Sequence, residues 1–301
     1  MHLQAWLHPD LQDIFELQDQ MASSVVGAII PHLDRAEMDR ANRKPTASLE
    51  AYDYYLRGAA HVARYTKEAN DAAFPLFQRA IELDPDFALA HAAAAQWYVQ
   101  RRVWGWTADR KKEAAEAVGF ATQALKLSKD DPMILAYCGW TLVTCGQDVE
   151  TGAGYLEQAI RLDANFSSAL IWAGLAKAFM GGHNTAIEYF RRALRLSPLD
   201  MRIHAIQGGL AASYFFLDRY EEALSWANAA LLQKPDFPLA LRIVTASYAG
   251  LKRDTEAWRT WERLKNVYPN ERISGLRERL SYSDEDVAKL ANAFRAVGVP
   301  E

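Results

Sequence analysis

Small and large apolar residues recur along the chain at one fixed spacing, and this pattern predicts how the chain folds. Between residues 167 and 200, Ala186, Phe190 and Ala193 follow one another at steps of four and three residues. Residues at these steps share one face of an α-helix, so two small residues flank one large side chain that fits between two helices. The stretch therefore predicts two antiparallel helices, with a turn at 181–184 and an end at Pro198.

The same triplet, small-x3-large-x2-small, occurs six times. The triplets are Ala73/Phe77/Ala80, Ala117/Ala121/Ala124, Gly152/Leu156/Ala159, Ala186/Phe190/Ala193, Ala223/Ala227/Ala230 and Ala257/Trp261/Leu264. Their first members are 44, 35, 34, 37 and 34 residues apart. One helix pair cannot bury its apolar face alone, so the repetition indicates a solenoid in which each pair packs on the next.

These repeats resemble the tetratricopeptide repeat (TPR) family, whose period is 34 residues. The resemblance rests on the triplets, on Gly174 at the helix contact and on Pro198 at the end of the repeat. It implies an all-α fold, a right-handed TPR superhelix of about six helix pairs, with an N-terminal lead-in helix and C-terminal capping helices. We expect a lead-in over residues 1–46, a repeat array over 47–271 and a helical cap over 272–301.

The first 60 residues carry a second resemblance. Residues 11–41 show an apolar stripe of helical period, and they are followed by Arg43-Lys44-Pro45 and by the aromatic stretch 52–58. Together they are similar to the segment that leads into the TPR region of bacterial adenylate/guanylate cyclase-type signalling proteins with a TolB-like segment. This resemblance implies that the chain is the regulatory, C-terminal part of such a protein.

The end of the chain predicts two further helices, over 271–280 and 284–296. Ser283 precedes the second helix and Asp286 follows three residues later, a variant of the capping box that starts helices. We expect these helices to cover the apolar face of the last pair.

Composition narrows the functional classes. The formal net charge is −4, with 24% charged and 50% apolar residues, which is typical of a soluble folded chain and disfavours nucleic acid as a partner. Cys138 and Cys145 would lie about 10 Å apart on one helix, too far for a disulfide, so we expect buried thiols. The longest early apolar run, residues 25–30, is far shorter than a membrane span, and no secretory signal is evident, so we expect a cytoplasmic protein without membrane contact.

Motifs of catalysis are missing from the sequence. The seven histidines show no HExxH spacing, neither cysteine has a CxxC partner, and no phosphate-binding or nucleophile-elbow motif occurs. His91 is interpreted as a packing residue. We therefore expect no enzyme activity, no cofactor and no metal.

The first helix of each TPR pair lines the concave side of a TPR array, and the family pattern assigns positions there. These positions are Gln96, Val99, Gln100, Trp140, Val143, Ile171, Leu175, Phe179, Phe215, Phe216 and Arg242. Such an apolar groove suits a protein or peptide partner, either an amphipathic helix, an apolar segment or a domain of the same parent protein. It is also compatible with a homo-oligomer, and the same residues equally suit the interior of a tightly wound array.

Trp104 and Trp106 surround Gly105 in an insertion, where connections normally carry polar residues. Two interpretations stay open: the indoles pack over the end of the first pair, or they form a binding platform with the basic residues around them. The second would support an alternative function, a small-molecule-binding or enzymatic protein with its site at this loop.

Overall fold

The computed structural model describes residues 48–198 and 200–301, so the predicted lead-in over residues 1–46 lies outside the described residues. Residues Glu50–Glu301 form one compact unit. Within the described ranges every regular element is a helix, which confirms the all-α prediction.

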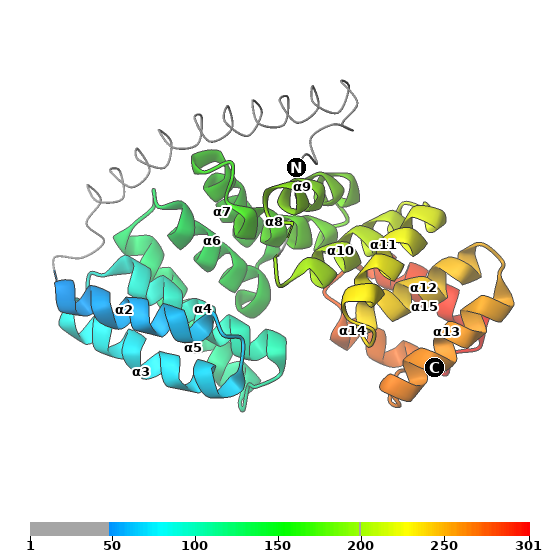
Figure 1. Ribbon diagram of the computed structural model, residues 1–301, viewed down its shortest axis with the longest axis horizontal. Helices are drawn as coiled ribbons and strands as arrows, with labels where there is room; N and C mark the ends of the chain where they lie inside the picture. Colours follow the sequence, from blue (N-terminus) through cyan, green and yellow to red (C-terminus); the bar gives the residue numbers. More distant parts are fainter. Residues whose placement is uncertain (1–47, 199) are drawn as a thin grey trace, which may run out of the picture. The chain divides into compact units, whose positions relative to one another are not determined.

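Six antiparallel helix pairs follow one another along the described chain (Figure 1). The pairs are α2 (Leu49–Val62) with α3 (Lys67–Leu83), α4 (Ala88–Trp104) with α5 (Arg110–Leu127), α6 (Pro132–Thr141) with α7 (Val149–Leu162), α8 (Ser167–Phe179) with α9 (His183–Leu196), α10 (Ile203–Phe216) with α11 (Tyr220–Gln233), and α12 (Pro238–Gly250) with α13 (Asp254–Val267). A π-helical turn, η1 (Leu142–Gly146), extends α6. The predicted solenoid is confirmed.

The C-terminal segment contains a 3-10 turn, η2 (Ile273–Gly275), then α14 (Leu276–Arg279) and α15 (Asp284–Val297). The segment predicted as one helix over 271–280 is therefore a 3-10 turn followed by a single α-helical turn, whereas the helix over 284–296 is confirmed. Ser283 caps α15 as predicted, because its Oγ accepts a hydrogen bond from the Asp286 N–H at 3.2 Å. The boundaries 47–271 and 272–301 stay a prediction.

The triplets hold the pairs together. All their residues are buried, and each triplet lies on the second helix of its pair. Phe190 shows how: a Cβ atom at Gly174 would lie 2.7 Å from its ring, and one at Gly209, on the next pair, would lie 2.6 Å from it. The ring thus fills the space that two glycines leave, and it joins one pair to the next.

Each turn inside a pair contains one residue with a left-handed backbone. These residues are Tyr65, Gly105, Gln147, Gly181, Asp218 and Lys252. Glycine occupies this position in only two of the six turns, so the tight reversal between the two helices does not depend on glycine.

Arginine side chains add links between successive pairs. Arg192 of α9 donates to the carbonyl of Ala164, and Arg263 of α13 donates to that of Pro235. Both acceptors lie 28 residues earlier, where the preceding repeat ends. Gln158 of α7 makes the corresponding bond to the Lys129 carbonyl at 3.2 Å.

Two smaller predictions are confirmed, and the structure defines where the second helix of the first pair begins. His91 is buried and its Nε2 lies 2.9 Å from the Pro85 carbonyl, as expected of a packing residue. Cys138 and Cys145 are unbridged and buried, and burial raises the pKa of the Cys138 thiol to about 12. In the first pair, Thr66 caps α3 and the helix runs through Pro75.

No helix in the described ranges has the length and apolar character needed to cross a membrane.

Replacing Gly209 by Ala tests the contact at Phe190. The added methyl would collide with a fully buried ring, so we expect the free energy of unfolding to fall by about 1–3 kcal/mol in urea denaturation. Gly154→Ala is the matched control, since its Cβ would meet no atom within 4 Å and the helix of α7 should gain about 0.5–1 kcal/mol. Equal effects of the two substitutions would contradict the repeat register.

Candidate functional site

Most of the residues expected to line the concave groove are buried. The buried ones are Val99, Gln100, Trp140, Val143, Ile171, Phe215, Phe216 and Arg242. In this structure the side chains of these residues are covered by other parts of the same chain. Whether these residues contact a partner stays a prediction.

The polar members of this set already have partners within the chain. Gln100 accepts a hydrogen bond from Asn70 at 2.8 Å and donates to the Val62 carbonyl at 3.1 Å. Arg242 makes a two-pronged ion pair with buried Glu271, with nitrogen to oxygen distances of 2.7 and 2.8 Å. Both residues therefore stabilise the solenoid, because a buried polar group without a partner is costly.

The aromatic members pack in the same way. The rings of Trp140 and Trp172 lie parallel, 6.1 Å apart and 3° from coplanar. Arg202 lies over the Trp172 ring at 5.9 Å and is itself held by Asp200 and by Ser168 Oγ at 3.0 Å. The insertion at 201–203, which lengthens one repeat, thus supplies a structural contact.

Gln96, Leu175 and Phe179 remain partly exposed. Gln96 lines a small cavity of about 140 Å³ together with Tyr65 and Tyr137. Its Oε1 has no hydrogen-bond partner among the described residues. These three positions are the part of the predicted groove that still reaches the surface.

The C-terminal segment packs against Phe179, at the end of α8, and Phe216, at the end of α10. Tyr282 is buried, and its ring centre lies 4.9 Å from that of Phe216 and 5.5 Å from that of Phe179. Burial raises the pKa of the Tyr282 hydroxyl well above its ordinary value. The chain therefore supplies its own cover for this part of the concave side.

A buried polar contact joins the same segment to the start of α9. The Nε2 atom of His183 lies 3.0 Å from Asp286 Oδ1, and the imidazole stacks on the Phe216 ring at 5.0 Å. Ser283 Oγ donates to the other Asp286 oxygen at 2.8 Å. Serine contacts the carboxylate and not the imidazole, so this trio lacks the nucleophile–base hydrogen bond that a hydrolytic triad requires.

Lys289 of α15 makes the third contact with the repeats. Its Nζ atom lies 2.7 Å from Asp218 Oδ1 and 2.9 Å from the Phe216 carbonyl. The hydrogen bonds from Lys289 and Tyr220 hold the pKa of Asp218 below its ordinary value. Burial, and then the bond to Asp218, raise the pKa of Tyr220 to about 12.

Trp104 and Trp106 lie together at the surface. Their rings are 5.9 Å apart and nearly parallel, and Trp104 is 43% exposed. Trp104 also contacts Tyr65, in the turn of the first pair, as the packing interpretation expects. Lys234, at the end of α11, lies 5.9 Å from the centre of the Trp104 ring. The exposed face leaves the platform interpretation open.

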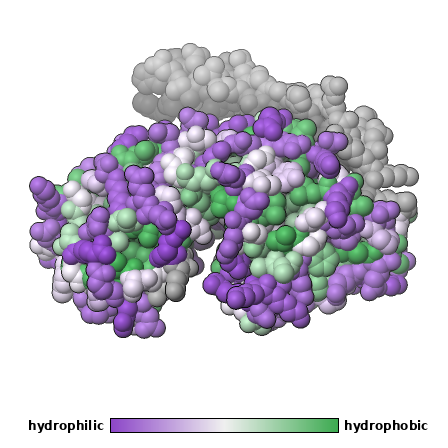
Figure 2. All heavy atoms as spheres, turned by 180° about the vertical axis from the view of Figure 1, so that it is seen from behind, coloured by the Kyte–Doolittle hydropathy of each residue, from purple (hydrophilic) through white to green (hydrophobic). Residues whose placement is uncertain are grey.

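Figure 2 shows apolar side chains separated by polar ones across one face of the molecule. Within the described ranges no group of three or more His, Cys, Asp or Glu side chains is arranged to hold a metal ion.

Comparisons with known proteins agree with this geometry. Residues 167–198 match the sequence model of the tetratricopeptide repeat. Similar solved structures include a chain of the APC/C hetero-tetramer Cut9-Hcn1, with TM-score 0.62 and 19% identity over 88% of this chain and 46% of that one. The type IV pilus biogenesis factor PilW has TM-score 0.59 and 17% identity over 75% and 96% of the two chains. At these identities the likeness concerns the fold alone. The chain has the fold of a TPR α-solenoid.

One relative has a more particular description. The protein described as "Putative adenylate cyclase 3" from Rhizobium meliloti is 26% identical over 122 residues, which are 40% of this chain and 21% of the relative. The chain thus matches about a fifth of that protein's length.

Sequence reasoning did not find the contacts that residues 282–289 make with α8, α9 and α10. The available signal was the polar and aromatic series Tyr282, Asp286 and Lys289, at steps of four and three residues, in a segment expected only to cover the last pair. The partners lie in other repeats, and the repeat pattern carries no information about them.

Replacing Asp286 by Ala would leave His183 buried without its partner. We expect the free energy of unfolding to fall by about 1–3 kcal/mol, measured by chemical denaturation. A double-mutant cycle with His183→Ala isolates the pairwise coupling. The neighbouring exposed change Glu285→Ala should have little effect, and a zero coupling energy would contradict the buried contact.

Proposed function

We propose that this chain is a non-catalytic protein-binding scaffold and acts as the regulatory part of a bacterial signalling protein of the adenylate cyclase type. The observation that supports the scaffold role is the fold itself. Stacked helix pairs present an extended surface on which many residues contact one partner, and TPR proteins mediate interactions between proteins.

The signalling role rests on weaker support. The partial match to the Rhizobium protein agrees with the sequence resemblance of the first 60 residues, and it covers a minor part of that relative. The TolB-like segment and the cytoplasmic location remain predictions. A partner that belongs to the same signalling protein fits this proposal, since repeat arrays bind neighbouring domains as readily as separate chains.

Two surfaces among the residues singled out in the sequence are available to such a partner. The first is the partly exposed remainder of the concave side at Gln96, Leu175 and Phe179, and the second is the Trp104–Trp106 loop. Exposed tryptophans are frequent energetic centres of interfaces, because they bury much apolar area with little loss of side-chain freedom.

Capture from a lysate of the encoding organism, followed by chemical cross-linking and mass spectrometry, tests the scaffold role. We expect Trp104→Ala to reduce capture of the specific partner several-fold if the loop belongs to the interface, since removing such an anchor costs about 2 kcal/mol or more. Leu232→Ala is the control, because Leu232 is an even more exposed apolar residue on α11, 84% against 43% for Trp104, and lies outside both surfaces. Capture of no specific protein would overturn the scaffold proposal.

The exposed, stacked indoles also support a second candidate, a small-molecule site at the loop. Binding of a planar or cationic compound there would quench the fluorescence of Trp104, and Trp104→Phe would remove that signal. Saturable quenching together with unchanged protein capture would favour this second candidate.

A further inference from the structure

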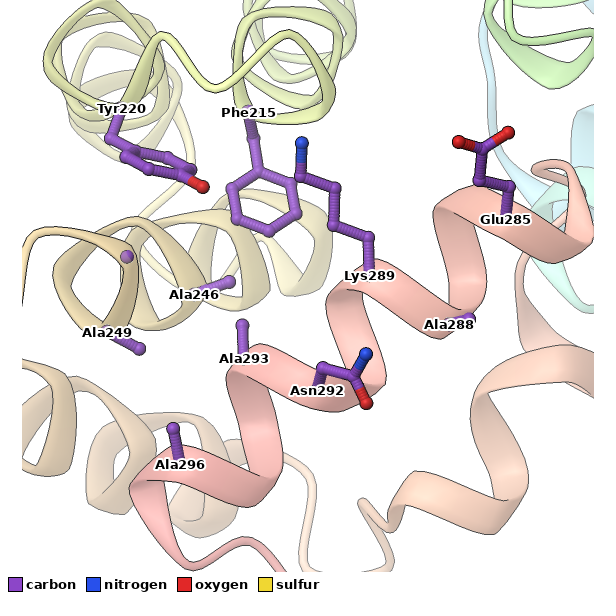
Figure 3. Close-up of a pocket in the computed structure, with 11 residues that line it drawn as sticks. Phe215, Tyr220, Ala246, Ala249, Glu285, Ala288, Lys289, Asn292, Ala293 and Ala296 are labelled. Atoms are coloured by element: carbon purple, nitrogen blue, oxygen red, sulfur yellow. The ribbon is translucent and has the colours of Figure 1, made fainter.

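An open hollow of about 510 Å³ separates α15 from the ends of α10, α11 and α12 (Figure 3). The rings of Phe215 and Tyr220 lie on one side of it. Small residues of α12 and α15 form the other walls: Ala246, Ala249, Gly250, Ala288, Ala293 and Ala296. The hollow belongs neither to the Trp104 loop nor to the partly exposed residues of the concave side.

The hollow persists because neither wall is able to close it. Small side chains recur at helical spacing on α12 and α15. Each of these helices therefore lines the hollow with backbone and methyl groups, where a packed interior would have large side chains. The opposite face of α15 is anchored, since Leu290 and Phe294 are buried and Phe294 packs against Trp261 at 6.3 Å. Lys289 is fixed by Asp218 and the Phe216 carbonyl. Movement of α15 into the gap would break these contacts.

Of the two charged side chains that line the hollow, Glu285 and Lys289, only Lys289 has an oppositely charged partner in the described part of the chain. Lys289 is neutralised by Asp218, whereas Glu285 is exposed and forms no ion pair within the described part of the chain. Glu285 and Ala296 mark the two ends of the hollow along α15, about 16 Å apart at the helical rise of 1.5 Å per residue. This length matches about three turns of a helix.

We propose that the hollow binds an amphipathic helix of a partner protein, which adds large apolar side chains over Phe215 and Tyr220 and a lysine or arginine opposite Glu285. The inference rests on the scaffold function proposed above and specifies its partner. Small residues on two flanking helices allow a third helix to approach closely, and apolar residues at i, i+4 and i+7 of that helix would fill the three-turn gap. The basic residue of the partner helix would form an ion pair with Glu285 and so supply charge complementarity.

Peptide binding to the full chain tests this proposal. The probe is a fluorescein-labelled, alanine-based helical peptide of about 14 residues, with leucines at i, i+4 and i+7 and a lysine at each end. A matched peptide carries glutamates in place of the lysines. We expect fluorescence anisotropy to show roughly tenfold tighter binding of the lysine peptide at low salt, and Glu285→Lys to reverse this preference.

Ala296 provides the matched variants, because it is exposed and lines the hollow. Ala296→Leu fills part of the space and should weaken binding of the lysine peptide by about tenfold, with an unchanged or higher melting temperature. Ala296→Ser keeps the space open and should bind like the original chain.

Equal affinity of the Ala296→Leu and Ala296→Ser variants would overturn the proposal, as would failure of both peptides to bind. A change of oligomeric state in Ala296→Leu, seen by sedimentation, would assign the hollow to a second copy of the chain and would also overturn it. The scaffold function is tested separately, since capture of the specific partner that persists in Ala296→Leu would retain that function while excluding the hollow as its site.

Discussion

The close approach of neighbouring helices at small residues is the constraint on which the rest of the solenoid depends. Phe190 fits only because Gly174 and Gly209 lack side chains, and its ring belongs to the contacts within one pair and between two pairs at once. The same constraint determines what is left for binding. Helices that approach this closely cover the side chains between them, so Trp140 and Val143 are interior although the family pattern assigns them to the concave side.

The repeat architecture was predictable because its signal is local and repeated. Each triplet lies within eight residues of one helix, and six copies agree on the same packing, so Ala223 and Ala227 identified α11 as surely as Phe190 identified α9. The cap at Ser283 was predictable for the same reason, since its partner Asp286 is three residues away.

The exposure of the candidate binding residues was not predictable in the same way. Whether Phe216 faces solvent depends on Tyr282, which comes from a segment outside the repeats, and no periodic pattern connects the two positions. The hollow beside α15 likewise arises from small residues on two helices that the sequence separates widely. Because alanine is common in helices, the sequence does not indicate which alanines line a hollow. That becomes evident only from the structure, in which α12 and α15 face each other.

The contact between His183 and Asp286 has a consequence for the way the chain folds. A repeat array usually folds through neighbouring contacts, and each pair finds its partner soon after it is synthesised. This contact joins residues that are 103 positions apart, which raises the contact order of the last three pairs. During synthesis α8, α9 and α10 leave the ribosome well before α15, so the ring of Phe216 lacks its cover until Tyr282 has been made. The segment that carries Tyr282 and Asp286 is therefore translated after the repeats whose burial it completes.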